Sequence, residues 1–149
     1  MKFHHEFSVP ASRDAAWAFL MDVPGLASCI PGVENLRPAG PDLWDAEVAA
    51  KIGPISARFG CRVQVVSLDE QAGAGVVAVT GRDAKLGSGV SATMTMRLSP
   101  DGPGTRIAVD SDVDVMGKIG QYGHGMFARR ADAMIAELEG CARARLGGS

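Results

Sequence analysis

Two kinds of hydrophobic spacing divide the chain. Residues 2–9 alternate apolar and polar positions, which predicts a half-buried β-strand that ends at Pro10. Between residues 12 and 21 the apolar positions recur three and four apart behind a capping serine, which predicts a helix. A second short helix is expected after Pro24, before the chain turns at Pro31.

Beyond residue 32 the spacing of two returns and continues to residue 115. Glycine, proline and aspartate clusters divide this region into segments, as expected for strands joined by turns. The clearest strands cover residues 44–52, 59–65, 90–98 and 107–115, whereas residues 76–80 are apolar almost throughout and show no clear face. We therefore expect an α+β domain with about seven antiparallel strands, one face of the sheet covered and the other in water.

The last segment supplies the cover. Its apolar positions recur three or four apart from Gly120 through Phe127 to Ala142, which predicts a helix of more than twenty residues across the sheet.

Four glycines stand where this helix should begin, in MGKIGQYGHGMF (residues 116–127). Glycine inside a helix costs about 0.5–1 kcal/mol relative to alanine, so either the segment is a loop or the inner face of the helix must stay small. At helical spacing Gly117, Gly120 and Gly123 would face the sheet and leave a gap. Two occupants stay open: a ligand, or the side chains of Trp44, Phe59, Met94 and Met96.

Composition excludes several classes of protein. The 149 residues form an expected single domain (1–149), and their net charge of −2 argues against nucleic acid as a partner. No signal peptide or membrane-spanning segment is visible, so we expect a cytoplasmic protein. Three cysteines without a CxxC pair argue against both a disulfide framework and a zinc site.

Few residues offer chemistry. His5 shares a strand face with Phe3 and Phe7, and Tyr122, the single tyrosine, lies beside the glycines. Each is a candidate polar contact for a ligand. The other interpretation is an ordinary residue at the edge of the core, which is favoured for His5 because no partner for it can be identified in the sequence. We find no catalytic constellation, metal site or phosphate loop, so binding is favoured over catalysis.

Five segments resemble the carbon monoxide dehydrogenase G-subunit family, within the START/SRPBCC superfamily of helix-grip folds. They are FSVPASRDAAWAFLMD, SCIPGVENL, KIGPISARF, GRDAKLGSGVSATMTMRL and, most specifically, DVDVMGKIGQYGHGM. The resemblance implies a curved sheet gripping the long helix around an apolar cavity.

It also implies an accessory protein that recruits a molybdenum hydroxylase to the inner face of the membrane and is linked to quinone, with no covalent cofactor. By position, the family segment would contribute Gly117, Ile119, Gly120, Tyr122, Gly123 and Met126 to the pocket wall. Inward-facing strand and helix positions complete the expected ligand site: Trp44, Val48, Phe59, Met94, Met96, Val113 and Phe127. The alternatives are a polyketide cyclase or aromatase-like enzyme and a lipid carrier of the same fold.

Overall fold

The computed structural model describes residues 1–147, so the last two residues of the expected domain lie outside it. Its elements follow in the order β1 (Lys2–Val9), α1 (Arg13–Met21), α2 (Val23–Ala27), β2 (Val33–Gly40), β3 (Leu43–Ile52), β4 (Ile55–Asp69), β5 (Ala74–Asp83), β6 (Ser88–Asp101), β7 (Gly104–Met116), the 3₁₀ helix η1 (Lys118–Tyr122) and α3 (Gly123–Arg145). The predicted cap of α1 is confirmed, because the Ser12 side chain accepts a hydrogen bond from the Ala15 N–H at 3.2 Å.

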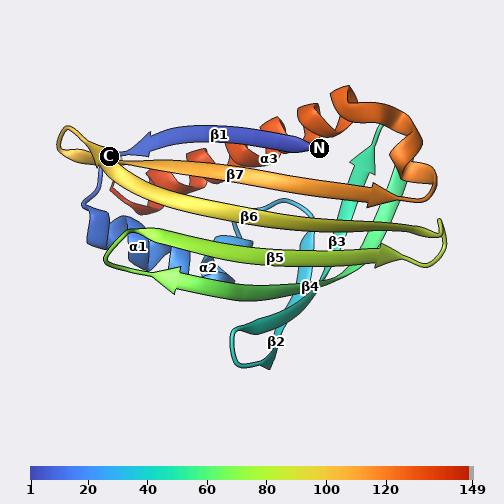
Figure 1. Ribbon diagram of the computed structural model, residues 1–149, viewed down its shortest axis with the longest axis horizontal. Helices are drawn as coiled ribbons and strands as arrows, with labels where there is room; N and C mark the ends of the chain where they lie inside the picture. Colours follow the sequence, from blue (N-terminus) through green and yellow to red (C-terminus); the bar gives the residue numbers. More distant parts are fainter. Residues whose placement is uncertain (148–149) are drawn as a thin grey trace.

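The strands form one seven-stranded antiparallel sheet in the order β1-β7-β6-β5-β4-β3-β2. In Figure 1, β1 and β5–β7 run side by side, whereas β3 and the first part of β4 rise steeply at one end. The sheet is therefore strongly curved. α3 comes closest to β1 and β3, which lie on opposite sides of the central strands, so the expected helix-grip arrangement is confirmed.

The core is divided into two clusters at opposite ends of α3. The first core joins α1 and the end of α3 to β1, β6 and β7, and includes Phe7, Leu20, Leu98, Ile107 and Ala142. The second core joins the start of α3 and η1 to the β3–β4 hairpin, and consists of Ile52, Ala57, Phe59, Ile119 and Phe127. The long helix is thus packed firmly near each end.

Between the two cores, inward-facing apolar side chains of the sheet belong to neither cluster. Strand register places them on the same side as the core residues, because they alternate or pair with them. All of them are only half-buried. We call this set the central inward face: Val48, Val63, Val65, Val77, Val79, Ala92, Met94 and Val113.

The glycines before α3 do not form the small helical stripe that their spacing predicts. Gly117 lies before η1 with φ 86°, and α3 begins only at Gly123, so the helical interpretation of this segment is wrong. A Cβ on Gly117 would lie 2.3 Å from the Gly87 carbonyl oxygen. This glycine permits a tight turn against the β5–β6 connection and does not open a gap.

A disulfide links two of the three cysteines, contrary to the expectation from their spacing. Cys29, which follows α2, is bonded to Cys141 in α3, with the Cα atoms 5.7 Å apart. The pair is separated by 112 residues in sequence and is brought together by the packing of α2 beside α3. Cys61 is free, and burial raises the pKa of its thiol.

β4 separates from β5 at Gly60. Residues 55–59 of β4 pair with β3 alone, whereas the pairing with β5 begins at Gly60 opposite Arg82. The buried Asp83 side chain takes the place of the missing strand, because its Oδ2 accepts the Arg58 N–H at 2.9 Å. Its Oδ1 accepts the N–H groups of Lys85 and Leu86 in the following turn.

Substitution of Gly117 should lower the free energy of unfolding, because the turn before η1 requires a residue without a side chain. We expect Gly117→Ala to destabilise the protein by more than about 1 kcal/mol, since the added Cβ meets backbone at a positive φ. Gly140→Ala is the matched control: it lies inside α3 with no atom within 4 Å of an added Cβ, so we expect a gain of about 0.5–1 kcal/mol. Urea unfolding measures both, and a neutral Gly117→Ala would contradict the turn.

Reduction of the disulfide should lower the free energy of unfolding by about 2–4 kcal/mol, because it releases a long closed loop in the unfolded chain. Urea unfolding with and without a phosphine reductant measures the difference. Cys61→Ser should leave the effect intact, whereas Cys29→Ser should abolish it. Equal stability in both conditions would show that the bond does not form.

Asp83 should make stability depend on acid pH. Hydrogen bonds to the carboxylate, first from the Arg58 N–H, lower its folded-state pKa below the ordinary value of 3.8. Its stabilising effect is therefore complete above that ordinary value and is lost as the pH falls through the lowered pKa. Urea unfolding from pH 7 to pH 2.5 should show wild type converging on Asp83→Asn, with Asp114→Asn on exposed β7 surface as control. A constant difference across this range would refute the assignment.

Candidate functional site

The central inward face brings together part of the predicted ligand site. Val48, Met94 and Val113 belong to it, from β3 and the β6–β7 hairpin. Trp44 also points inward, two residues before Ala46 on β3, and is half-buried. At these four residues the predicted ligand site coincides with half-buried apolar side chains that face the inside of the sheet.

Other predicted residues lie in the cores. Phe59, Ile119 and Phe127 are buried in the second core and Met126 packs against it, while Met96 packs against the first core. Four side chains were proposed to fill the gap between helix and sheet. Two of them, Phe59 and Met96, are part of or pack against the two cores. Trp44 and Met94 stay half-buried.

Tyr122 and Met126 cover the β3–β4 turn. A Cβ built on Gly53 would lie 2.6 Å from the Met126 sulfur and 3.9 Å from a ring carbon of Tyr122. The start of α3 therefore packs against the turn of the β3–β4 hairpin. Tyr122 is half-buried, and its hydroxyl makes no hydrogen bond with any residue that the structure describes.

His5 joins β1 to α3. Its Nε2 lies 2.7 Å from Asp132 Oδ1, and its side chain is 15% exposed. Nδ1 is buried and has no hydrogen-bond partner among residues 1–147. A buried polar atom without a partner is costly, and a ligand atom or an ordered water would remove that cost.

Arg130 presents a second buried nitrogen of this kind. It lies on α3 one turn after Met126, on the flank that faces the β3–β4 hairpin. Its Nε is buried and unpaired within the described part of the chain. An oxygen atom of a ligand would satisfy this N–H.

A small apolar hollow of about 260 Å³ adjoins Trp44 between α2 and the inward side of β2 and β3. Its other lining residues are Pro24, Ala27, Ser28, Val33 and Leu36. It has the polarity expected for the ring or tail of an apolar molecule.

A larger hollow of about 360 Å³ lies around Gly60, where β4 leaves β5, and the sequence did not indicate it. A Cβ added to Gly60 would meet no atom within 4 Å, so the strand surface there is open. The side chains around it project outward from β2–β5: Arg37, Asp45, Glu47, Arg62, Thr80 and Arg82. Gly60 between Arg58 and Arg62 is a signal in the sequence that could have led to this place.

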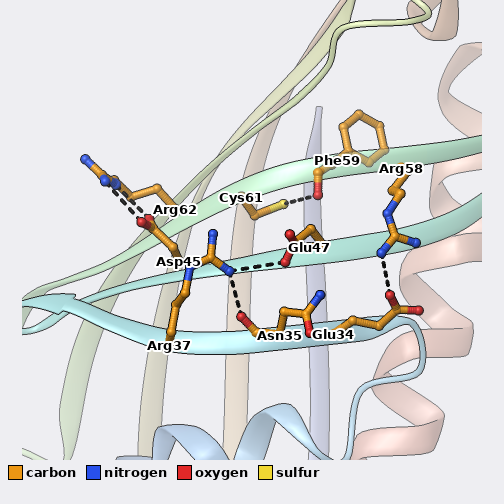
Figure 2. Close-up of polar contacts among 9 residues, drawn as sticks. All are labelled: Glu34, Asn35, Arg37, Asp45, Glu47, Arg58, Phe59, Cys61 and Arg62. Atoms are coloured by element: carbon orange, nitrogen blue, oxygen red, sulfur yellow. Dashed lines mark hydrogen bonds and ion pairs between the residues drawn. The ribbon is translucent and has the colours of Figure 1, made fainter.

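Ion pairs order one side of this outer hollow (Figure 2). Arg62 binds Asp45 through two nitrogens at 2.9 and 3.2 Å, and Arg37 binds Glu47 at 3.2 Å. Arg58 binds Glu34 at 2.6 Å. The hydrogen bonds from Arg62 lower the pKa of Asp45, and the same contact raises the pKa of Arg62.

Arg82 differs from these arginines. It is exposed at the rim of the outer hollow opposite Gly60, and no acidic partner is found for it within residues 1–147. The two acidic residues that line the hollow, Asp45 and Glu47, are already paired with Arg62 and Arg37. The hollow therefore carries one uncompensated positive charge.

Metal ligands do not gather anywhere in the described part of the chain. Residues 1–147 contain no cluster of three or more potential ligands among histidine, cysteine, aspartate and glutamate. Within the same residues no helix has the length and apolar character needed to cross a bilayer.

Solved structures share this fold at low sequence identity. A conserved protein from Geobacillus kaustophilus is similar with a TM-score of 0.89 and 19% identity, over 100% of this chain and 97% of that one. The Zhui aromatase/cyclase from Streptomyces sp. R1128 has a TM-score of 0.68 and 16% identity, over 98% and 93% of the two chains. A START superfamily protein from Mycobacterium smegmatis has a TM-score of 0.67 and 16% identity, over 97% and 96%.

No curated protein sequence matches the chain. The family model for the carbon monoxide dehydrogenase G-subunit (CoxG), in contrast, matches residues 6–147. With nearly its whole length matched, this chain belongs to the CoxG family.

Proposed function

We propose that this protein is a non-enzymatic accessory protein that binds an apolar ring compound, a quinone, on the central inward face. The observation that carries the proposal is the set of half-buried apolar side chains that neither core cluster includes. Covering them with a ligand would remove apolar surface from water at about 25 cal/mol per Å². Met94 at the centre suits an adaptable surface, since methionine changes its shape easily.

Two buried nitrogens beside α3 are candidate polar contacts for the oxygen atoms of such a ring. Nε of Arg130 is a donor and fits a quinone carbonyl. When Nε2 of neutral His5 donates to Asp132, Nδ1 is an acceptor and fits a quinol hydroxyl. Tyr122, whose hydroxyl is unpaired in the described chain, is a third candidate contact at the start of α3.

Membership of the CoxG family supports the second half of the proposal. According to this half of the proposal, the protein recruits a molybdenum hydroxylase to the inner face of the membrane. The bound quinone would accept electrons from the hydroxylase there. The chain supplies the apolar surface and the polar contacts, and the hydroxylase supplies the redox chemistry.

An enzyme of the cyclase kind is the alternative. It requires a proton-transferring group at the ligand, for which His5 and Tyr122 are the candidates. His5 has one nitrogen committed to Asp132, and the similarity to an aromatase/cyclase extends to the fold alone. Turnover of a polyketide that is abolished by both His5→Ala and Tyr122→Phe would favour the enzyme over the carrier.

Filling the central inward face should abolish ligand binding. Ala92 lies on it opposite Val113, and Ala92→Phe adds a ring where the quinone would sit. We expect wild type to bind a short-chain menaquinone saturably and Ala92→Phe to bind at least about tenfold more weakly, a difference of about 1.4 kcal/mol. Isothermal titration calorimetry measures both affinities.

Ala108→Phe provides the control, since Ala108 points outward on β7 between inward-facing Ile107 and Val109. It should bind within twofold of wild type, with circular dichroism showing both variants folded. No saturable binding by wild type would refute the ligand, and equal affinity of the two variants would refute the site. A saturated fatty acid that binds as tightly as the quinone would instead indicate a lipid carrier.

A further inference from the structure

The outer hollow is an open depression on the sheet surface. It faces away from the helices, because its side chains alternate with the inward-facing ones on β3, β4 and β5. Its space of about 360 Å³ exists because Gly60 has no side chain at the point where β4 leaves β5. Asp83 holds that separation in place from within the sheet.

The charge of the outer hollow is favourable for an acidic group. The carboxylates of Asp45 and Glu47 are bound by Arg62 and Arg37, which leaves Arg82 without a counter-charge in the described chain. An arginine side chain binds a carboxylate through two parallel hydrogen bonds. The Thr80 hydroxyl, two residues earlier on the same outward face, can donate a further hydrogen bond to it.

Apolar side chains continue this outward surface along β4 and β5. Val66 lies at a bulge of β4 and is 55% exposed. Val76 and Ala78 of β5 point outward on the same face as Thr80 and Arg82 and are half-buried. An apolar strip beside a polar hollow is the arrangement found at protein interfaces, where a few anchors insert into pockets.

We propose that the outward face of β3–β5 is the docking surface for a protein partner, and that the outer hollow receives an acidic side chain of that partner. This inference rests on the proposed function, in which the partner is the molybdenum hydroxylase. The carboxylate pairs with Arg82, while Val66, Val76 and Ala78 contact apolar side chains beside it. The ligand on the central inward face and the hydroxylase on the outward face therefore occupy opposite sides of one sheet.

A protein fits this surface better than an anionic membrane does. The carboxylates of Glu34, Asp45 and Glu47 surround the arginines and would repel a continuous layer of negative headgroups. A folded partner can place a single acidic side chain at Arg82 and donor groups opposite the neighbouring carboxylates.

Two different substitutions test the hollow with little effect on folding. Arg82→Glu reverses the unpaired charge of an exposed side chain. Gly60→Gln fills the hollow instead, and its Cβ meets no atom within 4 Å. We expect each to weaken binding of the purified molybdenum hydroxylase, encoded by the same genome, at least about tenfold in biolayer interferometry. Arg97→Ala, on the outward face of β6, should stay within twofold of wild type.

The outcomes separate this inference from the proposed function. Hydroxylase binding that is unchanged in Arg82→Glu and Gly60→Gln overturns the docking surface and leaves recruitment intact. No binding by wild type at micromolar protein overturns both, while the menaquinone titration still decides the ligand. If Arg82→Glu releases the chain from phosphatidylglycerol vesicles without affecting the hydroxylase, the hollow is a headgroup site and the inference fails. Thermal melting of each variant confirms that binding is compared between folded proteins.

Discussion

Anchoring of α3 at both ends is the constraint on which the rest of the structure depends. Its 23 residues span about 34 Å at 1.5 Å per residue, long enough to reach across a curved sheet. Phe127 packs near its beginning, and Ala142 and the Cys29–Cys141 bond hold its end. Between these two points α3 comes closest to β1 and β3 and not to the central strands. The apolar side chains of the central strands consequently remain half-buried.

The same curvature has an opposite effect on the outward face. Where β3 and the start of β4 turn away from β5, the inner side becomes concave and the outer side opens around Gly60. Asp83 lowers the cost of this separation, because its carboxylate accepts the Arg58 N–H that would otherwise be left without a partner. One bend thus creates two surfaces of different chemistry, apolar within and charged outside. This division would let a protein hold a small molecule and a large partner at the same time.

Local patterns predicted much of the fold because they report local physics. The alternation in residues 2–9 corresponds to β1, and Ser12 caps α1 as expected. Strand lengths were underestimated: residues 59–65 belong to β4, which spans Ile55–Asp69, because backbone pairing with neighbours extends a strand beyond its alternating positions. The ambiguous segment 76–80 became central strand β5, where Val77 and Val79 point inward and Val76 and Ala78 point outward. Because both sides of β5 are partly covered, apolar residues occupy both, and the sequence shows no alternation that would identify the inward side.

The candidate site was less accessible to such reasoning. Val48, Met94 and Val113 were found because they lie on the apolar side of alternating strands, but Phe59 shares that property and is enclosed in a core. Ile119 of η1 and Phe127 of α3, predicted from the glycine segment and the helical stripe, are enclosed in the same core. Which of them stays uncovered depends on where α3 touches the sheet. The glycine spacing misled for a related reason. Gly117 and Gly120 fit a helical period, yet the positive φ of Gly117 shows that it serves the turn before η1.

The sequence by itself determined the order and kind of the elements and the apolar side of most strands, since these follow from side-chain spacing within a single segment. The tertiary structure decided the contacts between distant segments: the Cys29–Cys141 bond, the split core, the unpaired nitrogens of His5 and Arg130, and the outer hollow. Each depends on the curvature of the whole sheet and on the two points at which one helix is held. Neither is encoded in a single stretch of sequence, because both result from many weak contacts satisfied together.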